Sequence, residues 1–277
     1  MIDSKISVIM GIYNCDNTLE EAIDSIFSQT YENWELILCD DASSDRTYEI
    51  AKRYQTEFPD KIFLLRNEKN MGLNFTLNRC LEIAHGQYVA RMDGDDISCP
   101  ERFEKELAFL ETNPQFALVS AEMEMFDESG VWGKTSVIPE PKIHDFCKHT
   151  PFFAHAAVMI RAEVLREVGG YTIDPRLLRV EDCHLWFKIY AAGYRGANIP
   201  QILYCMRNDR RATSRRTWQT RKNGMYMMRV GFKMVKMPWY KYIYLLRGGL
   251  LELIKCVIPS QLYELIYRKK YQRKYHK

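Results

Sequence analysis

The chain of 277 residues lacks the features that define several protein classes. Its eight cysteines are scattered singly without a C-x-x-C pair, so neither a zinc site nor a compact disulfide framework is expected, and a reducing cytoplasm is the expected compartment. No window of 18 residues is free of charge, which argues against a membrane-spanning helix. The N-terminal run MIDSKISVIMGIYN passes directly into a polar loop, which is typical of a first strand rather than of a signal peptide.

Acidic residues are scarce in the C-terminal part of the chain. Residues 201–277 hold 19 Lys and Arg but 3 Asp and Glu, a net charge of +16, whereas the remaining residues hold 20 and 33, a net charge of −13. Such a division predicts two parts that face different partners. The acidic part argues against a nucleic-acid-binding protein, while the basic part alone could meet anionic lipid, phosphate or nucleic acid.

What the sequence does contain, first, is a regular alternation of apolar runs and helical spacing. The first 100 residues predict four strands, at Lys5–Tyr13, Trp34–Cys39, Lys61–Arg66 and Gln87–Met92. Helical patterns separate them, beginning with a capping box at Thr18 and Glu21 and continuing at Thr47–Tyr54 and Leu73–Ala84. This alternation predicts a doubly wound α/β sheet, whose ligands bind at the carboxyl ends of the strands.

The second half of the chain has less regular patterns. They predict a helix at Glu101–Thr112, a strand near Phe116–Ser120, an irregular segment at 121–150, an apolar run at Phe152–Ile160, a helix near Arg161–Val168, a helix opened by Glu181 and Asp182, and a strand at 199–207. Beyond about Arg210, apolar residues recur every three or four positions among cations, which predicts amphipathic helices. We therefore divide the chain into a catalytic domain at 1–215, with a nucleotide part at about 1–100 and an acceptor part at about 101–215, and a basic helical tail at 216–277.

The run ARMDGDDIS at Ala90–Ser98 is the most informative feature of the sequence. It places Asp93, Asp95 and Asp96 directly after a predicted buried strand. Carboxylates this close together repel one another unless a positive group lies among them. Hard oxygen ligands suit Mg²⁺ or Mn²⁺, which commonly bridge carboxylates to substrate phosphates. An isolated D-x-D is also common in acidic surface turns, so the surrounding motifs decide between the two interpretations.

Several spaced motifs together resemble one family. The segments SVIMGIYN, TLEEAIDSIFSQTYENWELILCDDASSDRT, NMGLNFTLNRCLEIAHGQYVARMDGDDISCPERFEKE, AHAAVMIRAEVLREVGGY and VEDCHLWFKIYAAGY are similar to the family 2 glycosyltransferases of the GT-A fold, over roughly residues 4–210. The resemblance implies a sugar donor, usually a UDP-sugar, lying across the carboxyl edge of the first strands. It also implies a metal at the D-x-D motif, a general base in a later E-D motif, and transfer with inversion.

The resemblance assigns the nucleotide site to one set of positions. Tyr13 would stack on the base, Asp40 or Asp41 would accept the uracil imide hydrogen while the other caps the Ser43–Thr47 turn, and Asp93 would bind the ribose. The full set is Ile12, Tyr13, Asp40, Asp41, Asn70, Gly72, Asn78, Asp93 and Gly94. Relatives carry A-R-N where this chain has Leu77-Asn78, and Arg79 or Arg91 could replace the missing arginine or be surface residues.

The same resemblance assigns the chemistry. Asp95, with Asp93, would hold Mn²⁺ or Mg²⁺, and Asp182, with Glu181 as second choice, would be the general base, although these acids also suit a helix N-terminus. Three further residues are candidates for the cleft, each with a structural alternative: His155, Trp186 and Arg207. Relatives carry a histidine where this chain has Asp209, which leaves the third metal ligand open.

The leading hypothesis is an inverting glycosyltransferase that moves a sugar to a hydroxyl of a glycan or a lipid-linked acceptor. A nucleotidyltransferase is an alternative, but no phosphate loop of the G-x-G-T type is present. A catalytically inactive nucleotide-binding membrane scaffold is another, but both acidic motifs are intact. The basic tail predicts a protein that lies on an anionic membrane surface, and the resemblance implies that this surface is the inner face of a bacterial membrane. The tail helices could instead pack on the catalytic domain or form a homodimer.

Overall fold

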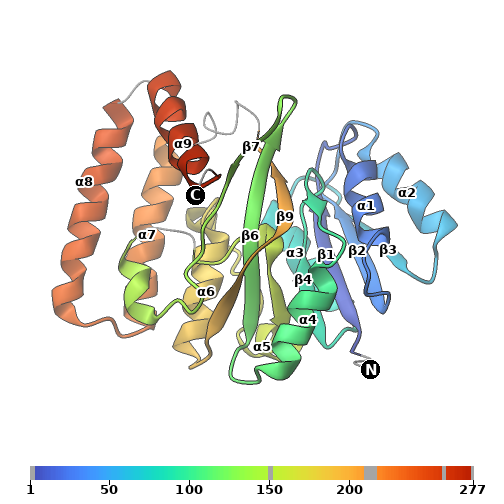
Figure 1. The fold of residues 1–277 in the computed structure, drawn as a ribbon, viewed down its shortest axis with the longest axis horizontal. Helices are drawn as coiled ribbons and strands as arrows, with labels where there is room; N and C mark the ends of the chain where they lie inside the picture. Colours follow the sequence, from blue (N-terminus) through green and yellow to red (C-terminus); the bar gives the residue numbers. More distant parts are fainter. Residues whose placement is uncertain (1–3, 149–151, 209–216, 258–259, 276–277) are drawn as a thin grey trace.

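A computed structural model describes residues 4–148, 152–208, 217–257 and 260–275 of the chain. Their strands form one mixed sheet in the order β3–β2–β1–β4–β8–β6–β9–β5, with β7 paired to β6 (Figure 1). In chain order the strands are β1 (Ile6–Ile12), β2 (Trp34–Asp40), β3 (Ile62–Arg66), β4 (Tyr88–Arg91), β5 (Ile97–Ser98), β6 (Leu118–Asp127), β7 (Gly130–Lys134), β8 (Met159–Arg161) and β9 (Gly196–Arg207).

The first four strands are parallel, and β1, β2 and β4 are buried, as the near-continuous apolar runs predict, while β3 at the edge is mostly half-buried. One face of the sheet packs against α1, α2 and α4, and the opposite face packs against α3, α5 and α6. These helices are α1 (Leu19–Phe27), α2 (Thr47–Glu57), α3 (Leu73–Glu82), α4 (Arg102–Thr112), α5 (Ala162–Glu167) and α6 (Glu181–Ala191). The predicted doubly wound architecture is confirmed, and the carboxyl ends of β1, β2 and β4 meet at one edge.

The predicted irregular segment at 121–150 is wrong over its first part. Strand β6 continues to Asp127 and forms a hairpin with β7. Along β6 the half-buried Glu122 and Glu124 alternate with the buried Met123 and Met125. This alternation is that of a strand with one covered face. Later, residues Ile143–Lys148 form a short 3-10 helix.

The predicted capping box at the start of α1 is also wrong. Thr18 occupies the N-cap position, but its side chain makes no capping hydrogen bond to the helix. Its hydroxyl instead donates to the backbone carbonyl of Gly94 at 2.9 Å. The threonine therefore ties α1 to the loop that follows β4, and a tertiary contact replaces the local one.

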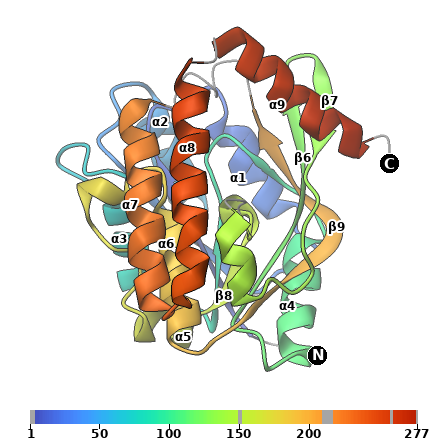
Figure 2. The same cartoon turned by 90° about the vertical axis from the view of Figure 1, so that its left-hand side faces the viewer.

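The C-terminal part is helical, with α7 (Trp218–Met234), a 3-10 turn η5 (Trp239–Tyr242), α8 (Ile243–Val257) and α9 (Ser260–Tyr275). Figure 2 shows α7 and α8 side by side next to α6, and α9 beside β7. Helix α7 packs closely on α6, because a Cβ at Gly231 would lie 2.2 Å from the ring of Phe187. Among the described residues, no helix has the length and apolar character needed to cross a bilayer.

Candidate functional site

Three carboxylates come together in the loop that leaves β4. Carboxylate oxygens of Asp93, Asp95 and Asp96 all lie within 4.8 Å of one another. Asp96 is buried, and the other two are half-buried. The strand places the first of them at the carboxyl edge of the sheet, where the architecture predicts a ligand site.

Positive and polar groups surround these carboxylates. The buried guanidinium of Arg91 forms a two-pronged ion pair with Asp93, and the backbone N–H of Asp93 donates to the hydroxyl of Tyr204 at 3.2 Å. The backbone N–H of Arg207 donates to Asp96 at 2.7 Å. Burial, followed by the charges of Asp93 and Asp95, raises the pKa of Asp96 well above its usual range. The cluster is therefore a place where an added cation relieves repulsion.

Arg207 links three parts of the site. Its Nε donates to the backbone carbonyl of Asp95 at 3.0 Å, and its guanidinium pairs with Glu21 of α1 and lies 4.5 Å from the ring centroid of Phe126. The last residue of β9 thereby holds the acidic loop against α1. Asp209, which stands where relatives carry a histidine, lies outside the described residues.

The ends of β1 and β2 form the neighbouring part of the edge. Ile12 is buried as the last residue of β1, and its carbonyl accepts a hydrogen bond from the backbone N–H of Asp41 at 2.9 Å. Tyr13 follows it with 49% of its surface exposed, which leaves its ring available to a ligand. The next residue, Asn14, has a positive φ of 48° and turns the chain back toward Ser43.

The two aspartates after β2 have different partners. Asp40 is fully buried and accepts hydrogen bonds from the backbone of Ser43 and from Arg66, at 3.2 and 3.0 Å. It therefore caps the turn that the sequence predicted one of the pair to cap. Asp41 accepts from the backbone N–H groups of Met71 and Gly72, at 2.7 and 2.8 Å.

Steric constraints explain why glycine occupies two positions in this region. Gly72 has a φ of +85°, a conformation that favours glycine, so the loop held by Asp41 can turn there. Asn70, in the same loop, is exposed. A Cβ at Gly94 would lie 3.1 Å from the sulfur of Cys15 and 3.2 Å from Ile12, closer than ordinary contact, so glycine favours this close approach of the acidic loop to β1.

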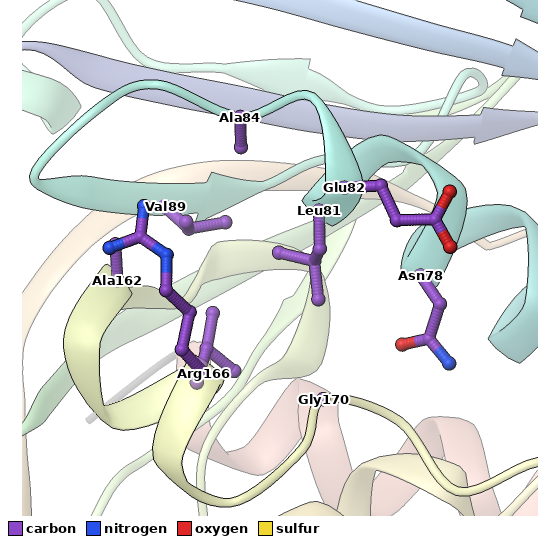
Figure 3. Close-up of a pocket in the computed structure, with 9 residues that line it drawn as sticks. Asn78, Leu81, Glu82, Ala84, Val89, Ala162, Arg166 and Gly170 are labelled. Carbon is purple, nitrogen blue, oxygen red and sulfur yellow. The ribbon is translucent and has the colours of Figure 1, made fainter.

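Asn78 lies on α3, on the side that faces α5. Its amide nitrogen donates to the carbonyl of Tyr171 and its amide oxygen accepts from the N–H of Tyr171, both at 2.8 Å. Figure 3 shows the side chain directed toward the turn at Gly170, at the border of a pocket of about 290 Å³. Arg79, which with Arg91 was a candidate to replace the missing arginine or a surface residue, donates to the carbonyl of Arg66 at 2.7 Å.

Glu181 and Asp182 lie in the first turn of α6. Burial is the main cause that raises the pKa of Asp182, and hydrogen bonds from Cys183 and the charge of Arg91 oppose it. The pKa of Glu181 is also raised, first by burial and then by the charge of Asp182, and Arg91 again lowers it. A raised pKa makes each carboxylate a stronger base than an exposed one.

His155 and Trp186, two further candidates for the cleft, lie beside each other. The Nε2 atom of His155 is 2.8 Å from the hydroxyl of Tyr171, and burial together with the charge of Arg91 lowers the pKa of this histidine well below its usual range. Trp186 is fully buried with its ring edge-on to Phe153. The hypothesis that Trp186 is a sugar platform is therefore wrong, and its alternative, core packing, is what the structure shows.

Comparisons with known proteins decide the family. The model of "Glycosyl transferase family 2" matches residues 7–169 of the chain. The chain belongs to glycosyl transferase family 2. Glycosyltransferase EpsE of Bacillus subtilis (strain 168) is 42% identical over 96% of this chain and 94% of its own length. The amylovoran biosynthesis glycosyltransferase AmsE of Erwinia amylovora is 31% identical over 95% of this chain and 98% of its own length.

The fold agrees with this family. The crystal structure of S. aureus TarS residues 1–349 in complex with UDP matches with a TM-score of 0.67, covering 87% of this chain and 69% of that one, at 19% sequence identity. The resemblance stated from the motifs is confirmed, and the mixed sheet with its helices is that of GT-A glycosyltransferases. The chain is a glycosyltransferase.

The structure also brings in residues of this glycosyltransferase that the sequence reasoning missed. Tyr171 and Tyr204 approach the site through their hydroxyl groups, and Glu21 reaches it through Arg207. Tyr171 follows Gly169 and Gly170, and this G-G-Y sequence was a usable signal. Tyr204 had none, because its contact with Asp93 spans 111 residues along the chain.

Proposed function

We propose that the chain transfers a sugar from a nucleotide-sugar, with UDP-sugars the first candidates, to a hydroxyl of a glycan or lipid-linked acceptor, with inversion. One observation carries the proposal: Arg91 interacts electrostatically with both the acidic loop and the acids of α6. Its guanidinium pairs with Asp93, and its charge opposes the rise that burial causes in the pKa of Glu181 and of Asp182. A donor-binding group and a candidate base therefore share one site.

The acidic loop fits a divalent cation. Its carboxylate oxygens are hard ligands at close spacing, and burial, followed by repulsion from Asp93 and Asp95, raises the pKa of Asp96. Asp95 and Asp93 would hold Mn²⁺ or Mg²⁺, and Asp96 supports the loop through Arg207. When bound, the metal would neutralise charge on the departing diphosphate.

We propose Asp182 as the general base, with Glu181 as second choice. The carboxylate would accept the proton of the acceptor hydroxyl while the hydroxyl oxygen bonds to the anomeric carbon and the bond to the diphosphate breaks. Its position at the first turn of α6 restrains it, and burial raises its pKa toward the range in which a base works well.

The nucleotide would lie across the edge formed by β1 and β2. The exposed ring of Tyr13 would stack on the base, with the carbonyl of Ile12 and the backbone near Gly94 beside it. Asp40 and Asp41 would border the base while they hold the turn at Ser43 and the loop at Asn70–Gly72. The contacts of Asn78 with Tyr171 instead support a positioning role for that residue.

We further propose that the product belongs to a cell-surface polysaccharide and that the protein works peripherally at the inner face of a bacterial membrane. The relative AmsE is named for amylovoran biosynthesis. Nineteen cations against three acids in residues 201–277 support attraction to an anionic surface.

Release of the nucleoside diphosphate from a panel of UDP-, GDP- and TDP-sugars tests the activity. We expect release that needs both the metal and an acceptor glycan, and Asp182→Asn should lower turnover by about 10²–10⁴ while donor affinity stays nearly unchanged. Glu181→Gln is the matched control and should lower turnover less. Donor binding without release under any of these conditions would support the scaffold, and pyrophosphate release from a nucleoside triphosphate would support a nucleotidyltransferase.

A further inference from the structure

Helix α8 carries a row of exposed apolar side chains. Trp239, Ile243, Leu246 and Leu250 have 85, 60, 72 and 60% of their surface exposed, and we call these four the α8 ridge. Their spacing of four, three and four residues places them along one side of η5 and α8. Single exposed apolar residues are ordinary on a protein surface, but a continuous row of four is a sign of an interaction site.

The opposite side of α8 already has its partners. Tyr242 and Leu245 pack against the core cluster that includes Phe232 of α7, and Gly248 is buried. A Cβ at Gly249 would lie 3.5 Å from the sulfur of Met225, which is an ordinary contact distance and places this side of α8 against α7. Figure 1 draws α8 at the outer edge of the molecule. The ridge therefore faces away from the protein.

Cations predominate in the segment that carries the ridge. Residues 217–251 contain no Asp or Glu and seven cations, namely Arg221, Lys222, Arg229, Lys233, Lys236, Lys241 and Arg247. Lys241 lies 5.8 Å from the ring of Tyr240, which is itself 54% exposed beside Trp239. Tryptophan and tyrosine favour the boundary between water and lipid, where one part of the ring is dry and another is wet.

Helix α9 looks similar in sequence but is engaged differently. Tyr267 lies 6.4 Å from Trp132 of β7 between ring centroids, and Arg268 pairs with Asp127 at 2.7 Å. A Cβ at Gly133 would lie 3.0 Å from the Cβ of Tyr271, so this tyrosine also packs on β7. The tyrosine face of α9 thus binds the catalytic part of the chain.

We propose that the α8 ridge and its surrounding cations are the surface that docks on an anionic lipid bilayer. This inference rests on the peripheral location proposed above and names the residues responsible. The apolar ridge would enter the boundary between headgroups and acyl chains while the cations neutralise lipid phosphates. Anionic lipid is the occupant that fits, because a second copy of this chain docked through the same face would bring seven more cations against these seven.

Vesicle flotation of the full chain tests the proposal. The vesicles contain phosphatidylcholine alone or with phosphatidylglycerol, and binding should need the anionic lipid and weaken at high salt. The triple variant I243Q, L246Q and L250Q should bind at least about tenfold less. The matched control on α9, L262Q, L265Q and I266Q, replaces side chains with 50, 57 and 53% exposure and should bind as the parent does.

A second pair of variants separates the local cations from total charge. K236Q, K241Q and R247Q should lower binding about a hundredfold, at about 1 kcal/mol for each cation near the surface. K52Q, K269Q and K270Q remove the same charge elsewhere and should lower it much less.

Three results would overturn the inference. The first is vesicle binding that does not depend on lipid charge. The second is a loss of vesicle binding in the α9 variant but not in the α8 ridge variant. The third is a dimer of the full chain in sedimentation velocity that only the ridge variant dissociates. Nucleoside-diphosphate release with a water-soluble acceptor should be unchanged in every variant. If the ridge and cation variants float as the parent does while release is normal, the docking surface alone is refuted. If the parent shows no release, the proposed activity is refuted.

Discussion

Asn78→Ala would remove both side-chain hydrogen bonds that hold the backbone of Tyr171. The amide of Asn78 bonds to the N–H and the carbonyl of that residue at 2.8 Å, across 93 positions of sequence. Tyr171 is 3% exposed, so its backbone groups would lose partners at a site with little access to water. Its hydroxyl, in turn, contacts the Nε2 atom of His155.

The magnitude follows from these two bonds. Leaving a buried backbone donor or acceptor unsatisfied costs about 1–3 kcal/mol each, so Asn78→Ala should lower the free energy of unfolding by about 3 kcal/mol. Asn74→Ala is the matched control one helical turn away. It removes a single bond, to the carbonyl of Thr172 at 2.9 Å, and should cost about 1 kcal/mol.

Urea unfolding and calorimetric titration with the donor test this reasoning together. For Asn78→Ala we expect a lower urea midpoint at an unchanged slope, with donor affinity within about twofold of the parent. The opposite result, an unchanged midpoint with donor affinity at least about tenfold weaker, would mean that the amide contacts the nucleotide, as the family resemblance implied.

Two further predictions concern charged groups. Asp95→Asn removes one anionic oxygen at nearly constant size, so calorimetry should show Mn²⁺-supported donor binding reduced at least about tenfold with an unchanged unfolding midpoint, and parent-like binding would refute the metal assignment. Burial raises the pKa of Glu106 to about 7 despite its ion pair with Arg102. Because the folded state holds this proton more tightly, the group stabilises the fold below about pH 4.5, and that contribution, about 3 kcal/mol, is lost as the pH rises through about 7. Glu106→Gln should flatten the plot of urea midpoint against pH in this window, and an unchanged slope would show that the carboxyl does not titrate there.

The sequence predicted the parallel half of the sheet because its signals are local. Strands β1, β2 and β4 are buried and β3, at the edge of the sheet, is mostly half-buried, so each appears as an apolar run that ends in polar residues. The end of α5 was equally readable, because glycine commonly ends a helix, and Gly169 and Gly170 both have positive φ in the structure. The positions of Asp93 and Asp95 followed directly from the end of β4.

Contacts between distant positions could not be predicted in the same way. The backbone N–H of Arg207 donates to Asp96 across 111 residues, and no periodicity in either segment indicates that contact. Thr18 shows how a tertiary contact can override a local pattern. Its sequence matches a capping box, but the hydroxyl binds Gly94, because the loop after β4 passes within reach.

The two tail helices show the same limit more sharply. Both carry apolar residues every three or four positions among cations, so one sequence argument predicted membrane contact for both. Asp127 separates them, since it gives Arg268 of α9 a partner on the catalytic part, beside which Tyr267 packs on Trp132. Residues 217–251, which carry the α8 ridge, contain no Asp or Glu. The tyrosine face of α9 therefore packs on β7, whereas the α8 ridge stays exposed.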